Sequence, residues 1–225
     1  MASVPRAALP LAIFLGGAIC LLLCNVSAPS TDAISVFKIE GYSGTITFGI
    51  WGFCYPSYVV VDQGIIELAG CTCASVGYVM TDVVKNVLRS TSMQSSLVRS
   101  HTGALVLYPI ATGLTYASFV SSAVVILGKS VKNGTMSHST LTILLGLAIY
   151  ALVVTFVAFL IGFSLCLKVV QQAHRMGDVD FHWGNIVWLT ALSLGAHIFN
   201  TYQLYSLREH YIENQASEIE SEIKA

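Results

Sequence analysis

Four long runs without charged side chains divide this chain, and they constrain its fold more than any other feature. The runs cover about residues 7–25, 102–128, 140–167 and 183–206. Because a helix needs about 20 mostly apolar residues to cross the hydrocarbon core of a bilayer, each run is long enough to be a membrane span. The mean hydropathy is +0.72 and only 10% of residues are charged. These values exclude an ordinary soluble domain, in which about 25% of residues are charged.

The remaining segments are organised around these spans. The sequence predicts a single tetraspan membrane domain over residues 1–225, with a long first loop at 26–101 and a short acidic tail at 208–225. A cleaved signal peptide is the alternative for residues 7–25, since Arg6 precedes the run and small residues follow it. The run is longer than the usual apolar region of a signal peptide, which favours a retained span.

The orientation of the spans follows from the cysteines rather than from the positive charges. Basic residues nearly balance between the two sides, and long loops translocate largely regardless of charge. The long loop contains Cys54, Cys71 and Cys73, and an extracellular setting lets a disulfide form there. We therefore expect an extracellular first loop and two cytosolic termini. The partner of Cys54 is either Cys71 or Cys73, and spacing does not decide between them.

The long loop has the pattern of short strands. Val36–Ile39 and Thr45–Trp51 read as one hairpin, and Tyr58–Val61 and Ile65–Leu68 as a second. A helix is expected between Asp82 and Arg99. The predicted fold is an all-α membrane protein, a four-transmembrane-helix bundle with a small disulfide-linked β-rich extracellular first loop. The expected sheet has three or four strands and one bridge.

No motif in the sequence points to catalysis. A glycine-rich phosphate loop, zinc-type His/Cys spacing and a Gly-x-Ser-x-Gly elbow are all missing from the sequence. Cys71 and Cys73 are too close in sequence to argue for a metal, and a disulfide is the better interpretation. We predict no catalytic residue, no cofactor and no metal. The net charge of −1 gives no basic field for nucleic acid, so the lipid bilayer is the expected surrounding.

His197 is the intramembrane polar candidate, because ionisable groups inside membranes are costly and often functional. A titrating imidazole could couple the bundle to pH. The favoured interpretation is a core side chain that is hydrogen-bonded across the bundle, with its partner among Thr155, Ser164 and Asn200. Small residues beside it predict close helix packing, namely Ala191, Ser193 and Gly195.

Three further features are predicted from residue type and position. Pro109 predicts a kink in the second span. Tryptophan and tyrosine residues predict interfacial belts at the two ends of the fourth span, namely Trp183, Trp188, Tyr202, Tyr205 and Tyr211. Isoleucine and alanine at helical spacing predict a helix in the acidic tail, either docked on a partner or solvated, and solvation is favoured.

The segment Gly49-Ile50-Trp51-Gly52-Phe53-Cys54, which follows the first span and precedes a loop cysteine and Gly77-Tyr78, resembles the fungal PalI family of pH-response regulators. These SUR/PalI-type tetraspans carry a Phe-Gly-aromatic-Gly-aromatic-Cys stretch and then a Cys followed by Gly-Tyr. Phe48–Cys54 and Cys71–Tyr78 hold those places here. The likeness covers about Pro5–Tyr205, and the loop is distantly similar to that of claudins. The structural motif comprises Gly49, Trp51, Gly52, Cys54, Cys71, Cys73, Gly77 and Tyr78.

The resemblance implies a function in ambient pH signalling. It implies a multi-pass plasma-membrane protein, not an enzyme, that assists the localisation or stability of a seven-span PalH-type pH receptor. Self-association into a homo-oligomer is compatible with it. The alternative is an eisosome or claudin-like tetraspan that organises membrane domains or mediates adhesion. A channel role would rest only on His197, Asn185 and Asn200. The histidines are scattered along the sequence, which argues against direct pH sensing by this chain.

Overall fold

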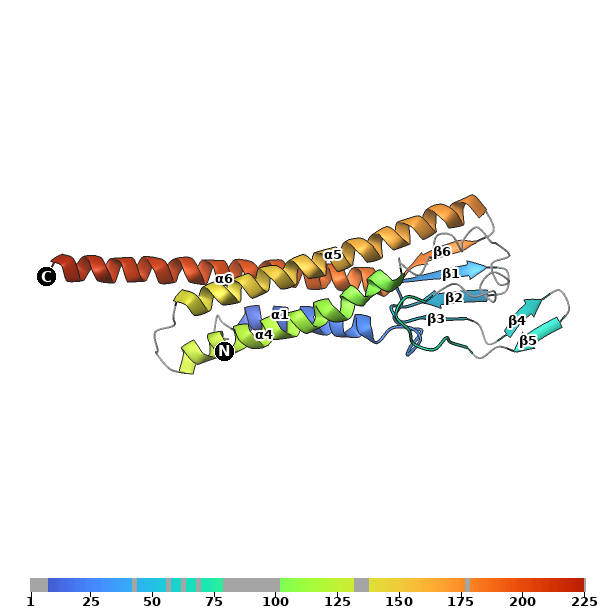
Figure 1. The fold of residues 1–225 in the computed structure, drawn as a ribbon, viewed down its shortest axis with the longest axis horizontal. Helices are drawn as coiled ribbons and strands as arrows, with labels where there is room; N and C mark the ends of the chain where they lie inside the picture. The colour runs from blue at the N-terminus through green and yellow to red at the C-terminus, as the bar shows by residue number, and fades with distance from the viewer. Residues whose placement is uncertain are drawn as a thin grey trace, which may run out of the picture.

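Four long helices and two small antiparallel sheets make up the computed structural model of this chain (Figure 1). The structure describes residues 8–41, 44–55, 58–61, 64–67, 70–78, 102–131, 138–176 and 179–224. The helices are α1 (Ala8–Asn25), α4 (Leu107–Val131), α5 (His138–Met176) and α6 (Asn185–Lys224). A short 3-10 helix, η2 (Ala104–Val106), directly precedes α4.

The four helices pack in a ring. Helix α1 contacts α6 and α4, and α5 contacts the same two helices from the other side. Helices α1 and α6 approach each other closely at Gly17 of α1, because a Cβ atom there would lie 2.6 Å from the Cβ atom of Ala196 on α6. Ser193 is buried against the same glycine, whereas Gly195 has open space around it. Ser193 therefore serves close packing within the bundle as predicted, whereas Gly195 lies on the outer side of α6.

Two of these helices are long and apolar enough to cross a membrane, within the part of the chain that the structure describes. They cover Ala104–Val124 and Ser139–Arg175. The apolar stretch Leu9–Asn25 is shorter, and polar residues such as Asn185 and His197 lower the hydropathy of α6. Length and composition thus support the second and third of the four predicted spans.

The helix boundaries differ from the predicted spans in three places. Trp183 lies in a strand, so α6 begins at Asn185. Helix α5 continues past residue 167 to Met176, and α6 continues through the acidic tail to Lys224 as one helix. Pro109 is the third residue of α4, where a helix tolerates proline because the first backbone N–H groups have no partner within the helix. The chain is already helical in η2 just before this proline, so the predicted kink in the second span stays a prediction.

The larger sheet has the strand order β3-β2-β1-β6, and each pair of adjacent strands in it is antiparallel. The first predicted hairpin is confirmed by β1 (Phe37–Gly41) and β2 (Gly44–Phe48), in which Ile39 pairs with Ile46. Strand β3 (Phe53–Cys54) follows β2. Strand β6 (Asp180–Trp183) was not predicted, because it is a four-residue strand between two helices, far from the other strands in sequence.

The second predicted hairpin is present, but it belongs to a separate sheet. It consists of β4 (Tyr58–Val61) and β5 (Gly64–Glu67), which pair only with each other among the described strands. The larger sheet thus has a strand number within the expected three or four, but its fourth strand is β6 and not part of the second hairpin. The helix predicted from Asp82 to Arg99 lies outside the described residues.

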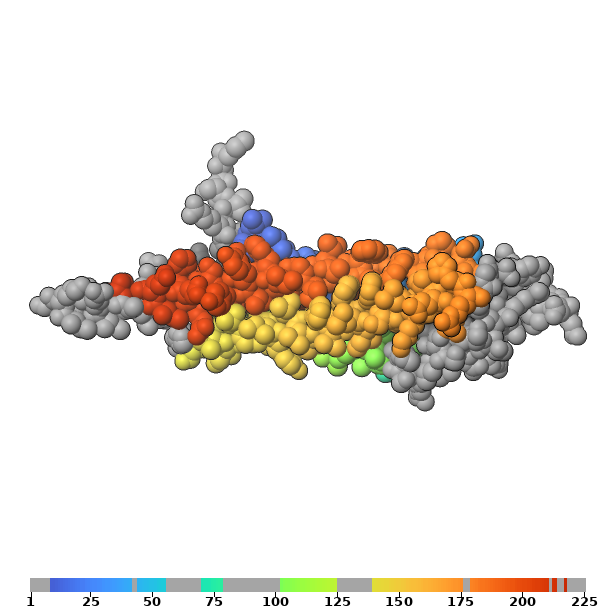
Figure 2. Space-filling model, turned by 90° about the horizontal axis from the view of Figure 1, so that it is seen from above, coloured from blue at the N-terminus to red at the C-terminus, as the bar shows by residue number. Residues whose placement is uncertain are grey.

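The main hydrophobic core lies where the larger sheet meets the end of the bundle. Phe37, Phe48 and Phe53 from the sheet are at most 1% exposed and pack in one cluster with side chains from all four helices. Figure 1 shows this sheet at one end of the bundle and the C-terminus of α6 at the opposite end. Helices α5 and α6 lie side by side along the face seen in Figure 2. The sheet and the bundle therefore form one packed unit.

Candidate functional site at the junction of sheet and bundle

The loop between β2 and β3 is closed by a hydrogen bond from the backbone N–H of Gly49 to the carbonyl oxygen of Gly52 (2.8 Å). This loop lies directly on the segment that follows α1. A Cβ atom on Gly49 would come closer than 3.0 Å to the backbone N, Cα and O atoms of Ala28, and the Ala28-Pro29 peptide bond is cis. Only a residue without a side chain fits at position 49.

Trp51 joins this loop to the C-terminal end of α1. Its indole N–H donates to the carbonyl oxygen of Asn25, the last residue of α1, at 2.9 Å. The last carbonyl groups of a helix have no partner within the helix, so the indole satisfies one of them. Nearby, the backbone N–H of Ile50 donates to the hydroxyl oxygen of Ser27 (2.9 Å). The helix end and the loop are thus held together by two hydrogen bonds.

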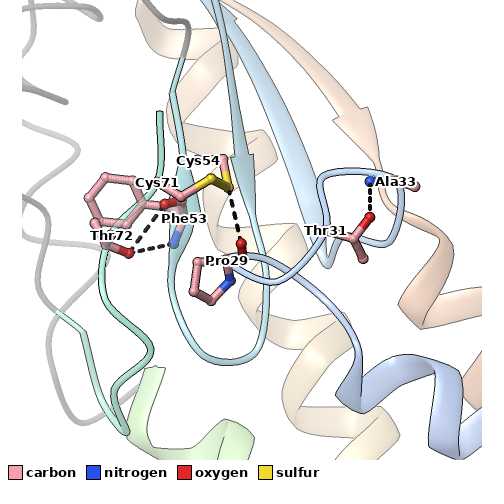
Figure 3. The surroundings of a disulfide bond; sticks show 7 residues. All are labelled: Pro29, Thr31, Ala33, Phe53, Cys54, Cys71 and Thr72. Carbon is pink, nitrogen blue, oxygen red and sulfur yellow. Dashed lines mark hydrogen bonds between the residues drawn. A yellow bond between two sulfur atoms is a disulfide. The ribbon is translucent and has the colours of Figure 1, made fainter. Parts of the chain in front are cut away.

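The disulfide pairs Cys54 with Cys71, which answers the question that the sequence left open (Figure 3). Cys73 is a free and exposed thiol. The backbone N–H of Phe53 donates to the hydroxyl of Thr72 (3.1 Å), and the backbone N–H of Thr72 donates to the carbonyl of Phe53 (3.0 Å). The bridge and these bonds hold the returning chain beside β3.

Gly77 and Tyr78 complete the junction. Gly77 has a φ of 69°, a left-handed conformation that favours glycine. The hydroxyl of the buried Tyr78 donates to the carbonyl of Gly49 (2.8 Å), and its ring packs against Phe53. Just before α4, the hydroxyl of Thr102 donates to the carbonyl of Tyr78 (2.7 Å). The motif residues other than Cys73 therefore meet at one place, where they join the ends of α1 and α4 to the sheet.

The burial of the Tyr78 phenol predicts a specific stability change at high pH. Burial, together with a smaller effect of the Cys166 thiol, raises the pKa of Tyr78 above its ordinary value of about 10. The folded state thus favours the protonated phenol, so this stabilisation is complete below pH about 10 and is lost as the pH rises further. Above that pH, we expect the unfolding free energy of the wild type to fall by up to about 1.4 kcal/mol per pH unit more steeply than that of Tyr78→Phe.

Chemical denaturation of both proteins between pH 8 and 12 measures this difference. Equal slopes for the two proteins would show that the phenol is not buried in the folded state. Because its pKa is raised, Tyr78 keeps its proton at mildly alkaline pH and does not act as a pH sensor in that range.

His197 is fully buried on α6, and its partner differs from the three predicted ones. Its Nε2 atom lies 2.8 Å from the hydroxyl of Thr115 on α4, and its ring packs edge-on against Phe14 of α1. The hydroxyl of Thr155 donates instead to the carbonyl of Ala151. The predicted set of Thr155, Ser164 and Asn200 was wrong because the inward face of α4 opposes that of α6 across the ring. Sequence spacing does not reveal which faces meet.

No group of three or more His, Cys, Asp and Glu side chains that could hold a metal ion occurs in the described ranges. The arrangement at the junction is one of backbone contacts, hydrogen bonds and a disulfide. Such an arrangement fixes the position of a sheet relative to a bundle.

The fold and the junction together define a small membrane protein whose helical bundle carries a sheet on one end. A model of the SUR7/PalI family matches residues 6–200. The chain belongs to the SUR7/PalI family, which confirms the resemblance seen in the motif residues. A comparison with curated proteins finds no match.

Proposed function

We propose that this member of the SUR7/PalI family is a plasma-membrane helper of ambient pH signalling. It assists the localisation or the stability of a seven-span PalH-type receptor, so that alkaline pH leads to processing of a zinc-finger transcription factor. It acts by contact and is not an enzyme. The match to the family over residues 6–200 is the observation that carries this proposal.

In this proposal all four helices span the membrane, with the sheet outside and both termini in the cytosol. Helix α1 is retained, because Phe14, Ala18 and Leu21 are fully buried and would lose their packing if it were cleaved. On α6, the exposed side chains of Trp188 and Tyr205 are about 26 Å apart along the helix axis. This separation is close to the roughly 30 Å of a hydrocarbon core, so aromatic side chains stand near both interfaces.

The outer surface of the bundle offers a place for the receptor to bind. Each of the four helices has a glycine with no atom within 4 Å of the position of its absent side chain, namely Gly16, Gly113, Gly146 and Gly195. Small residues on outer faces let a neighbouring transmembrane helix approach closely. A receptor that contacts the helices also meets a sheet in a fixed position, because the junction joins the two.

Deletion of the gene, followed by an alkaline shift, tests the proposal. We expect loss of transcription-factor processing, measured by immunoblot, and mislocalisation of a tagged PalH-type receptor. Wild-type protein should restore both. Gly195→Leu should fold and reach the surface but restore processing poorly, whereas Gly195→Ala should restore it well.

Normal processing with a correctly placed receptor in the deletion strain would refute this function. Immobile surface patches that form without the receptor would then favour the membrane-domain-organising alternative.

A further inference from the structure

A layer of polar side chains lies in the interior of the bundle, around the imidazole of His197. Its four members are at most 4% exposed, and each has a polar side-chain atom without a hydrogen-bond partner in the described part of the chain, namely Ser118, Ser193, His197 and Asn200. Buried polar atoms in folded proteins are nearly always hydrogen-bonded, because an unpaired one keeps the full cost of its removal from water. These four residues, the polar layer, therefore call for a partner from outside the chain.

The members of the polar layer lie close together on two helices. Helices α4 and α6 both run away from the sheet (Figure 1), and the contact between Thr115 and His197 links them. Ser118 follows Thr115 by three residues and Asn200 follows His197 by three, so both lie about 4.5 Å further along, at one common level. Ser193 precedes His197 by one turn on the same face of α6. The unpartnered atoms thus surround the imidazole.

The hydrogen bonds of Thr115 determine which kind of partner the imidazole needs. Its single hydroxyl hydrogen is donated to the carbonyl of Ala111 (2.7 Å), so its oxygen accepts the hydrogen bond from Nε2–H of His197. In the neutral imidazole, Nδ1 then carries a lone pair and is an acceptor. By contrast, Nδ2 of Asn200 is a donor. Water can donate to the first atom and accept from the second, whereas a metal cation would be repelled by the N–H groups of the amide.

Small and apolar side chains enclose the polar layer. On α6, Leu204 follows Asn200 by about one turn and packs in a buried cluster with Leu145 and Ala148 of α5. Because α5 runs toward the sheet, its buried Ala151 lies one turn beyond Ala148, near the level of Asn200. The methyl group of an alanine leaves more room between the helices than a larger apolar side chain would. The enclosure favours a few bound water molecules over an open path.

We propose that the polar layer is a binding site for water inside the bundle. Water donates a hydrogen bond to Nδ1 of His197, accepts one from Nδ2 of Asn200, and binds the hydroxyl groups of Ser118 and Ser193. These partners provide the two to four hydrogen bonds that a buried water molecule typically makes. His197 is then a structural centre that connects α4 and α6 both directly and through water. This proposal goes beyond the receptor-helper function and does not depend on it.

Solid-state NMR of the full chain in deuterated lipid bilayers at pH 8, with ¹³C- and ¹⁵N-labelled histidine, tests the proposal. We expect a protonated Nε2, an unprotonated Nδ1 and strong magnetisation transfer from water to the ring of His197, whose signals are identified by their loss in His197→Phe. Asn200→Leu keeps the side-chain volume but removes the amide, and Ser118→Val replaces the hydroxyl with apolar volume. Each should reduce the transfer at least threefold.

Ser121→Val is the matched control on the same helix. Ser121 is exposed, and its hydroxyl donates to the carbonyl of Ala117, so this variant should keep the wild-type transfer. Thermal unfolding shows which variants fold, and either Asn200→Leu or Ser118→Val is sufficient for the comparison. A wild-type transfer to His197 that is absent, or that stays unchanged in the folded layer variants, would overturn the proposal. A protonated Nδ1 with an unprotonated Nε2 would do the same.

Discussion

Gly49→Ala is expected to destabilise the protein by about 3 kcal/mol or more and to prevent the sheet from joining the bundle. The added methyl group would approach three backbone atoms of Ala28 more closely than real Cβ atoms approach their neighbours. Backbone atoms cannot rotate away as a flexible side chain can, so the loop must move. That movement breaks the hydrogen bond that Tyr78 donates to the carbonyl of Gly49. Thermal unfolding of the purified protein in detergent measures the loss.

The matched control is Gly113→Ala on α4. A Cβ atom at position 113 would have no atom within 4 Å, and alanine favours helix over glycine by about 1 kcal/mol. We expect this control to unfold at the same or a higher temperature than the wild type. If Gly49→Ala also unfolds at the wild-type temperature, the loop does not lie against Ala28 as described.

The sequence predicts the elements of this fold that have a local cause. Alternation of apolar and polar residues with an intervening turn is sufficient to predict the first hairpin, and length with hydropathy is sufficient for the two apolar helices. Strand β6 could not be predicted in this way. It pairs with β1, so that Lys38 lies opposite His182, only because α5 returns the chain to the sheet. Four residues with two charged or ionisable side chains do not by themselves form a recognisable strand.

The residues of the candidate site could be identified from the sequence, but the contacts between them could not. The motif residues were identified from a resemblance, and the structure shows the physical reason for several of them. Trp51 is needed for its indole N–H at the end of α1, and Gly49 for its lack of a side chain. Neither reason can be derived from the sequence, because both depend on Asn25 and Ala28 in a different segment. The same holds for the bond between His197 and Thr115, which joins residues on opposite helices of the ring.

Removal of the disulfide by the double variant Cys54→Ser/Cys71→Ser is expected to destabilise the protein by about 2–4 kcal/mol. The bridge closes a loop with a sequence separation of 17, and its loss increases the conformational entropy of the unfolded chain. Without the bridge, the segment beside β3 is held by hydrogen bonds such as those between Phe53 and Thr72, so we expect the segment that carries Tyr78 to detach from the loop before the bundle unfolds. Changing both cysteines avoids an unpaired thiol that could exchange with Cys73.

Cys73→Ser is the matched control, because it removes a neighbouring cysteine that is free and exposed. It should leave the unfolding temperature, the surface level and the signalling of the wild type unchanged, whereas the double variant should lower all three. Thermal unfolding in detergent, surface biotinylation and the processing immunoblot measure these effects. If the double variant matches the wild type in all three, the disulfide is not needed to keep the sheet on the bundle. If Cys73→Ser has the larger effect, Cys54 pairs with Cys73 in the folded protein.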